Sequence, residues 1–176
     1  LPAQIYASIP GIAIFGLNEI GVRITPVIYG VLTVLLLYFL LEEAFKIRPV
    51  SLMAAFLLAV SPWHIQLTRA SFESSFALFW IVMAMWFLIK GLKKKRWLLV
   101  SMLPFAVSVY TYNSARVFTP LFLFFIAVLY REYFWKMKKW FLLSGILLFI
   151  LLIPLAPFVL SGEAGARDKL VSLTDE

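Results

Sequence analysis

Long apolar stretches alternate with short polar gaps along the chain, and the gaps are of two kinds. Lysine and arginine crowd every second gap, whereas the gaps between them hold a mixed set of polar side chains. The basic gaps are Lys46–Arg48, Lys90–Arg96 and Arg131–Lys139; the mixed gaps are Ser61–Ser75 and Tyr110–Phe118. Because loops rich in Lys and Arg stay on the cytoplasmic side of a membrane, the alternation predicts a polytopic membrane protein whose mixed gaps face the other side.

Six apolar stretches are candidates for membrane spans, although a helix needs about 20 predominantly apolar residues to cross and three of them are shorter. Pro26 suits the first turn of the first span, and Pro62 would kink the second if it continued. The predicted spans cover residues 24–45, 50–62, 72–89, 97–112, 117–130 and 140–160. Six spans place both ends of the chain outside the cytoplasm.

The first 15 residues are apolar but too short for a span, and Pro2, Pro10 and Gly11 interrupt them. This favours a helix in the membrane interface on the side of the mixed gaps. We therefore predict an all-α fold, a polytopic transmembrane helix bundle of about six spans plus an N-terminal interfacial helix. Residues 1–160 would form one membrane domain, and residues 161–176 would begin an extracytoplasmic segment.

Composition supports a membrane setting, because 63% of the residues are apolar and 14% are charged, against about 45–50% and about 25% in soluble domains. Eleven of the 16 Lys and Arg residues lie in the basic gaps. There they suit anionic lipid headgroups, so we expect membrane lipids and no nucleic acid as partners. The chain has no cysteine and one histidine, which excludes disulfides and a His-rich zinc site.

The first mixed gap, SPWHIQLTRASFESS, concentrates His64, Gln66, Arg69 and Glu73 within ten positions. If the segment is helical, Arg69 and Glu73 are four residues apart and share a face with Gln66. A charged residue at membrane depth costs about 2.5–3.5 kcal/mol on insertion scales, so such residues face a cavity or a partner. The alternative is a salt bridge that orients the start of a helix, with His64 in a structural role.

The second mixed gap, YTYNSARVF, contains Tyr110, Tyr112, Asn113 and Arg116. Tyrosine and asparagine suit sugar hydroxyls, and the planar guanidinium suits phosphate. The alternative is an aromatic belt with an arginine that extends to the interface.

Arginine recurs on the same predicted side at the start of the first span, where Arg23 follows Glu19 by four residues. A salt bridge, with a helix cap at Asn18, would explain that pair. Isolated outer arginines nevertheless run against the charge bias of membrane proteins. A polyprenyl phosphate, whose phosphate lies at this depth, would explain Arg23, Arg69 and Arg116 together.

Three segments resemble the protein mannosyltransferase and aminoarabinose transferase family, glycosyltransferase family 39, whose members have the C-type membrane fold. Phe15–Leu40 resembles the family's G-x-N/S-E-x-x-x-R-x-P pattern. Ser61–Trp80 resembles its S-P-x-x-x-x-x-S/T-R-x-x-x-E/D pattern, and Tyr110–Leu123 resembles its Y-x-Y-x-x-A/S-R turn. The order and spacing of these patterns cover nearly all of the chain.

The resemblance implies transfer of a sugar from a polyprenyl-phosphate donor to a protein, lipid or glycan acceptor outside the cytoplasm. Arg69 and Arg116, with Arg23, would contact the donor phosphate. His64, Gln66, Tyr112 and Asn113 would bind sugar or acceptor. The catalytic base is expected in an acidic loop upstream of Leu1, so the chain would be inactive alone. Glu73 is a weaker candidate for the base.

Such enzymes vary in metal dependence, so no cofactor is certain and a divalent metal stays an open option. We expect an integral protein of a bacterial or archaeal cell membrane. The alternatives are a transporter or flippase subunit for a lipid-linked or anionic solute and a noncatalytic scaffold subunit. Transporters carry polar residues near the membrane midplane. Here the polar residues lie at the span ends, which favours the transferase.

Overall fold

The computed structural model describes residues 3–157, and the regular structure in this range is entirely helical. The all-α prediction is therefore confirmed. The predicted segment 161–176 and the last residues of the sixth span lie outside the described residues. The helices are α1 (Ala3–Phe15), α2 (Glu19–Phe45), α3 (Arg48–Ala59), α4 (Pro62–Arg69), α5 (Glu73–Lys93), α6 (Arg96–Thr111), α7 (Asn113–Leu129), α8 (Arg131–Lys136), α9 (Lys138–Leu152) and the 3-10 turn η1 (Ile153–Leu155).

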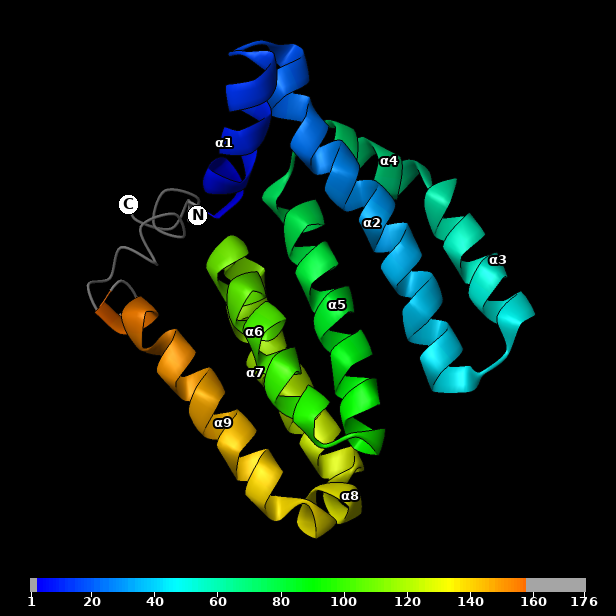
Figure 1. Cartoon of the computed structure of the whole chain (residues 1–176), viewed down its shortest axis with the longest axis vertical. Helices are drawn as coiled ribbons and strands as arrows, with labels where there is room; N and C mark the ends of the chain where they lie inside the picture. Colours follow the sequence, from blue (N-terminus) through cyan, green and yellow to red (C-terminus); the bar gives the residue numbers. More distant parts are fainter. Residues whose placement is uncertain (1–2, 158–176) are drawn as a thin grey trace, which may run out of the picture.

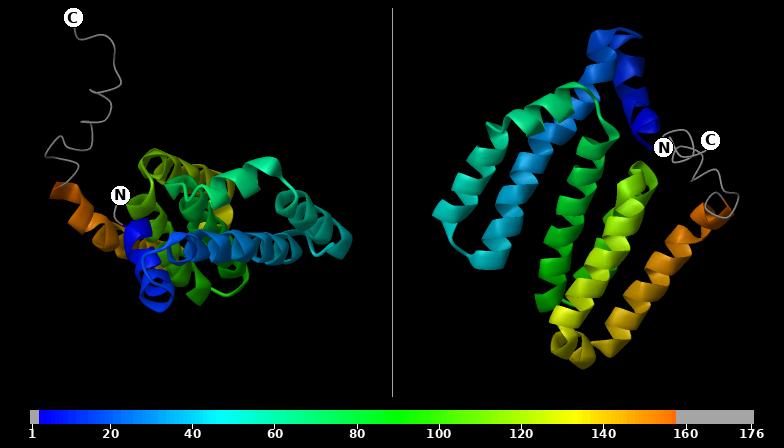
Figure 2. Two further views of the ribbon diagram at one scale, coloured as in Figure 1. Left: turned by 90° about the horizontal axis from the view of Figure 1, so that it is seen from above. Right: turned by 180° about the vertical axis from the view of Figure 1, so that it is seen from behind.

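The long helices lie side by side and run alternately up and down (Figure 1). Helix α5 packs between α2 and α6, while α6 also carries α7 and α9 on its other sides. Helix α3 covers the outer flank of α2, and the short helix α4 leads back from α3 to α5 (Figure 2). The best-buried apolar side chains sit between α5 and α6, where Phe105 and Leu98 are almost inaccessible.

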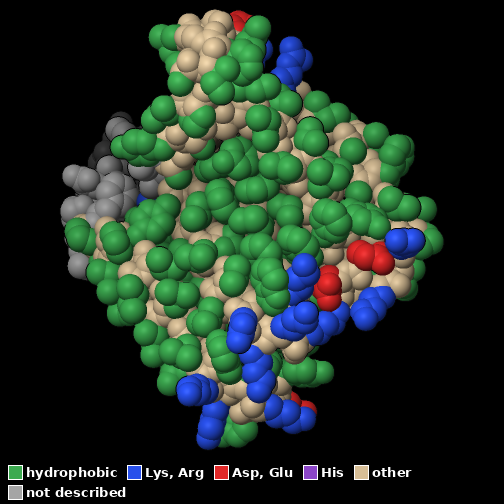
Figure 3. Space-filling model, in the orientation of Figure 1, with side chains coloured by type: hydrophobic (Ala, Val, Ile, Leu, Met, Phe, Trp, Pro, Cys, Tyr) green, Lys and Arg blue, Asp and Glu red, His purple; other side chains and the backbone are tan. Residues whose placement is uncertain are grey.

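The two kinds of polar gap lie at opposite ends of this bundle. The turns from α2 to α3, from α5 to α6 and from α7 through α8 to α9 form one end, which we call the basic end. Most Lys and Arg side chains in the space-filling view gather there (Figure 3). The α1–α2, α4–α5 and α6–α7 turns form the other end, which we call the mixed end. The alternation in the sequence thus becomes a separation in space.

Within residues 3–157, three helices are long and apolar enough to cross a membrane, namely α2, α5 and α9 with its extension to Leu155. Helices α3 and α4 pass the same test only as a pair, bent by 52°, which makes four. The bend follows Val60, close to the kink predicted at Pro62. Helices α6 and α7, with 16 and 17 residues, are apolar but shorter. A count of six spans therefore stays a prediction.

Helix α2 begins earlier than predicted, at Glu19 rather than at residue 24. Asn18 Oδ1 accepts a hydrogen bond from the Gly21 backbone N–H at 2.8 Å, which confirms the predicted cap. Glu19 then places a negative charge beside the positive end of the helix dipole. Pro26 lies inside the helix, so its assignment to the first turn was wrong.

Helix α1 is continuous through Pro10 and Gly11, which the sequence suggested as breaks. Gly11 instead permits a close crossing, since a Cβ there would lie 2.6 Å from the Gly21 carbonyl oxygen. Gly16, with φ of 81°, makes the turn between the two helices. Helix α1 is therefore packed against the start of α2, while its position in a membrane interface stays a prediction.

Candidate functional site

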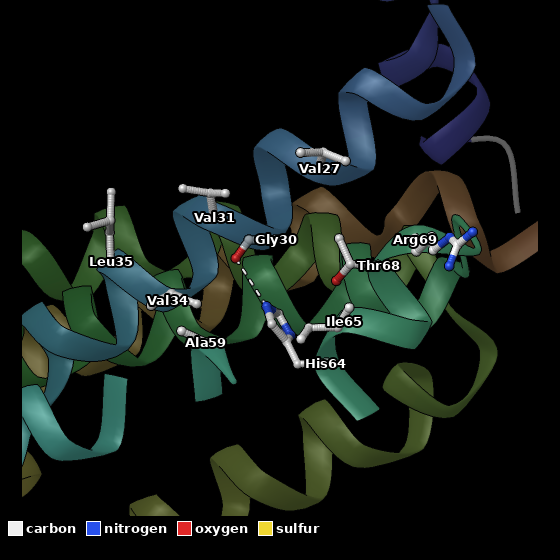
Figure 4. A pocket seen from close by; sticks show the side chains of 10 residues that line it. All are labelled: Val27, Gly30, Val31, Val34, Leu35, Ala59, His64, Ile65, Thr68 and Arg69. Atoms are coloured by element: carbon white, nitrogen blue, oxygen red, sulfur yellow. Dashed lines mark hydrogen bonds between the residues drawn. The ribbon is translucent and has the colours of Figure 1, made fainter. Parts of the chain in front are cut away.

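Helix α4 meets α2 at a contact that depends on a glycine. A Cβ on Gly30 would lie 2.5 Å from Thr68 Cγ2, so the missing side chain lets the two helices approach. One turn before Thr68, His64 is buried, and its Nε2 donates to the Gly30 carbonyl oxygen at 3.2 Å (Figure 4). This contact holds the first mixed gap against the first span.

A cavity of about 350 Å³ opens beside this contact. Helix α2 and the end of α3 supply mainly apolar walls, while α4 adds His64, Thr68 and Arg69. Arg69 is exposed at one end, with its guanidinium pointing away from the other lining side chains (Figure 4). The cavity therefore combines an apolar interior with a single cation at its margin, which is the arrangement that suits an amphiphile with an anionic head. The lining residues are Val27, Gly30, Val31, Val34, Leu35, Ala59, His64, Ile65, Thr68 and Arg69.

The predicted common face of Arg69 and Glu73 does not form. Helix α4 ends at Arg69, α5 begins at Glu73, and Ser71 between them has φ of 59°. A left-handed residue interrupts the right-handed helix, so the four-residue spacing no longer stacks the two side chains. Glu73 occupies the first turn of α5, where a carboxylate is favoured by the helix dipole. Gln66, by contrast, shares α4 with Arg69 as predicted, and both are exposed.

The turn between α4 and α5 is held by a residue from the start of the chain. Gln4 Nε2 donates to the Ser71 backbone carbonyl at 2.5 Å and lies 2.7 Å from the Ser71 hydroxyl. Gln4 is buried, although it precedes Ser71 by 67 residues. Helix α1 thus contributes directly to the shape of the mixed end.

The second mixed gap lies at the same end but does not line this cavity. Tyr112 has extended backbone angles and joins α6 to α7, while Asn113 begins α7 and is exposed. Arg116 follows in the first turn of α7, with its Nε and Nη2 atoms buried. Tyr110 is used structurally, since its hydroxyl donates to the Leu151 carbonyl oxygen on α9 at 2.8 Å.

Arg23 lies on an exposed turn of α2 and is 3.8 Å from Glu19, as the salt-bridge alternative predicts. It does not line the cavity. The structure therefore brings Arg69 and His64 to one cavity and leaves Arg23 and Arg116 elsewhere on the mixed end.

Sequence reasoning missed four residues that shape this region, namely Gly30, Thr68, Gln4 and Ser71. The signal for Gly30 was present as a lone glycine inside a long apolar stretch, which often marks a close approach of two backbones. Gln4 and Ser71 carried no such signal, because their pairing depends on how α1 folds back. Within residues 3–157, no three His, Asp or Glu side chains group as metal ligands would.

Comparison with protein families decides what kind of protein has this arrangement. The sequence profile of the family described as dolichyl-phosphate-mannose-protein mannosyltransferase matches residues 5–158. The chain belongs to this mannosyltransferase family. The match covers the cavity, both mixed gaps and the nine α-helices of the described part of the chain, apart from the first two residues of α1. Searches of curated proteins and of solved structures gave no match.

Membership in the mannosyltransferase family implies a membrane glycosyltransferase with a lipid-linked sugar donor. The apolar helices agree with that setting. The resemblance found in the three sequence segments is therefore confirmed at the level of the family.

Proposed function

We propose that this chain is part of an integral membrane glycosyltransferase that moves a sugar from a polyprenyl-phosphate donor to an acceptor on the extracytoplasmic face. The observation that carries the proposal is the family match over residues 5–158. The cavity between α2 and α4 supports it, because its apolar walls and marginal arginine suit the two parts of such a donor.

In this proposal the first isoprenoid units of the donor lie in the cavity and the phosphate lies outside it, at Arg69. Burying isoprenoid carbon is favourable by roughly 25 cal/mol per Å² of apolar surface. The phosphate stays at the margin, where the exposed guanidinium can form two parallel hydrogen bonds with it. Arg116 and Arg23 are further candidates for the phosphate, and Gln66, Tyr112, Asn113 and His64 for sugar or acceptor.

The reaction breaks the bond between the anomeric carbon and the phosphate oxygen and forms a bond from that carbon to the acceptor oxygen. A carboxylate base takes the proton of the acceptor hydroxyl, and the polyprenyl phosphate leaves with the bonding electrons. The guanidinium of Arg69 stabilises the negative charge that grows on the leaving phosphate. Glu73, at the start of α5, is the carboxylate of the mixed gaps that we assign as a candidate base.

The test is sugar transfer by membranes that contain the full-length protein and a labelled polyprenyl-phosphate sugar. Arg69→Ala should lower transfer by about 10²–10³-fold, the loss typical of removing one group that stabilises a developing anion. Arg48→Ala is the matched control, because Arg48 is an exposed arginine at the basic end. Transfer unchanged in Arg69→Ala would contradict the phosphate assignment. Movement of the labelled lipid between leaflets without transfer would instead indicate a flippase.

A further inference from the structure

A second hollow, of about 560 Å³, lies at the basic end, where α7, α8 and α9 meet. Arg131, Lys138 and Lys139 line it together with the apolar side chains Phe134, Trp135 and Leu142. The three basic residues are exposed, whereas Phe134 is buried beneath them. Cations and apolar surface therefore face the same space.

The charges of this hollow have no counterions among residues 3–157. Arg131, Lys138 and Lys139 form no ion pair with any residue in the range 3–157. Glu132, the acidic residue of the segment, does not line the hollow. Three like charges around one space repel one another, and a bound anion would relieve that repulsion.

An apolar cavity of about 220 Å³ between α7 and α9 adjoins the hollow, because both spaces are lined by Phe134 and Phe141. Helix α6 forms the floor of this cavity through Leu98 and Met102. On the α9 side it is lined by Gly145, where an added Cβ would meet nothing within 4 Å. Apolar lining therefore extends from the basic hollow to the space between the two helices.

We propose that these two adjoining spaces form a binding site for one anionic membrane phospholipid. Its phosphate would lie among Arg131, Lys138 and Lys139, and one acyl chain would enter the cavity beside Gly145. Basic pockets between membrane helices suit anionic headgroups. A free anion would leave the apolar cavity unfilled, and a neutral lipid would leave the charges unpaired. The site is at the opposite end of the bundle from the proposed donor cavity and is independent of the proposed transfer.

The test is lipid binding to the purified full-length protein in detergent, measured by native mass spectrometry. Phosphatidylglycerol should bind at least about tenfold more tightly than phosphatidylcholine with the same acyl chains, because only the former carries net negative charge. The variant Arg131→Gln/Lys138→Gln/Lys139→Gln should lose that preference. Its matched control, Lys94→Gln/Lys95→Gln/Arg96→Gln, removes three charges from the neighbouring α5–α6 turn and should keep it.

A second variant probes the acyl chain without altering charge. Gly145→Leu adds a bulky side chain at the lining of the apolar cavity and should weaken phosphatidylglycerol binding by at least about fivefold. Equal binding of the two lipids would overturn the proposal, as would equal losses in the two charge variants. Competition by inorganic phosphate alone would indicate a free-anion site, and preferential displacement by polyprenyl phosphate would reassign the site to the donor. If the Arg131/Lys138/Lys139 variant fails to fold, two measurements still test the proposal. These are the preference of the unaltered protein for phosphatidylglycerol over phosphatidylcholine and the effect of Gly145→Leu.

Discussion

The imidazole of His64 on α4 donates a hydrogen bond to the backbone carbonyl of Gly30 on α2, 34 residues earlier and 3.2 Å away. The same glycine lets Thr68 approach α2 closely. One position on the first long helix therefore receives both a polar and a steric contact from the short helix that ends in Arg69. The place of Arg69 beside the cavity depends on this crossing.

Gly30→Ala should destabilise the protein by about 1–3 kcal/mol, the range typical of overpacking. The new Cβ would lie 2.5 Å from Cγ2 of the buried Thr68, so the Thr68 side chain or one of the two helices would have to shift. Thermal unfolding in detergent measures the effect. Gly145→Ala is the matched control, since a Cβ there meets open space and should not lower stability.

A second substitution separates steric overlap from a change in helix preference. Adding Thr68→Ala to Gly30→Ala removes the overlapping methyl group and should restore most of the lost stability. If the double variant were as unstable as Gly30→Ala, the Thr68 contact would not be the cause.

His64→Leu should lower the free energy of unfolding by about 0.5–1.5 kcal/mol, the usual net value of one hydrogen bond. The loss stays modest because the Gly30 carbonyl lies inside α2 and can still accept from the helix backbone. Chemical denaturation measures it, and Trp63→Leu, an exposed neighbour, is the control. A loss above about 3 kcal/mol would indicate that His64 supports more than this single contact.

Gln4→Ala should loosen the turn between α4 and α5, because Gln4 Nε2 contacts both the carbonyl and the hydroxyl of Ser71. We expect faster hydrogen exchange at the Ser71 and Phe72 amides and a loss of about 1–2 kcal/mol of stability. Gln66→Ala, an exposed glutamine on α4, should leave that exchange unchanged. Unchanged exchange in Gln4→Ala would show that the turn does not need α1.

The ion pair between Lys93 and Glu43 joins α5 to α2 at the basic end. Both side chains are partly exposed, at 47% and 26%, so their coupling energy should be about 0.2–1 kcal/mol. A double-mutant cycle with Glu43→Gln and Lys93→Gln measures it, and the coupling should shrink as salt is added. A coupling energy near zero at low salt would contradict the pairing.

In the first mixed gap, part of the structure could be predicted from the sequence and part could not. Its residue types and the presence of a helix were predictable, because an apolar stretch, a proline and a cluster of polar residues follow one another. The helix break at Ser71 was not, since serine has no local preference for a positive φ. A partner 67 residues away, Gln4, contacts that turn, and Arg69 and Glu73 consequently lie on different helices.

The sequence by itself determined the helical fold, the family and the separation of a basic end from a mixed end. These properties depend on hydropathy and charge within each segment and on the order of short patterns, all of which act locally along the chain. Only the tertiary structure decided which outer arginine lines a cavity and which two helices leave an apolar space beside the basic residues. Such choices depend on contacts between distant segments, as at Gly30 and Thr68, because a single methyl group sets how closely two helices can pack.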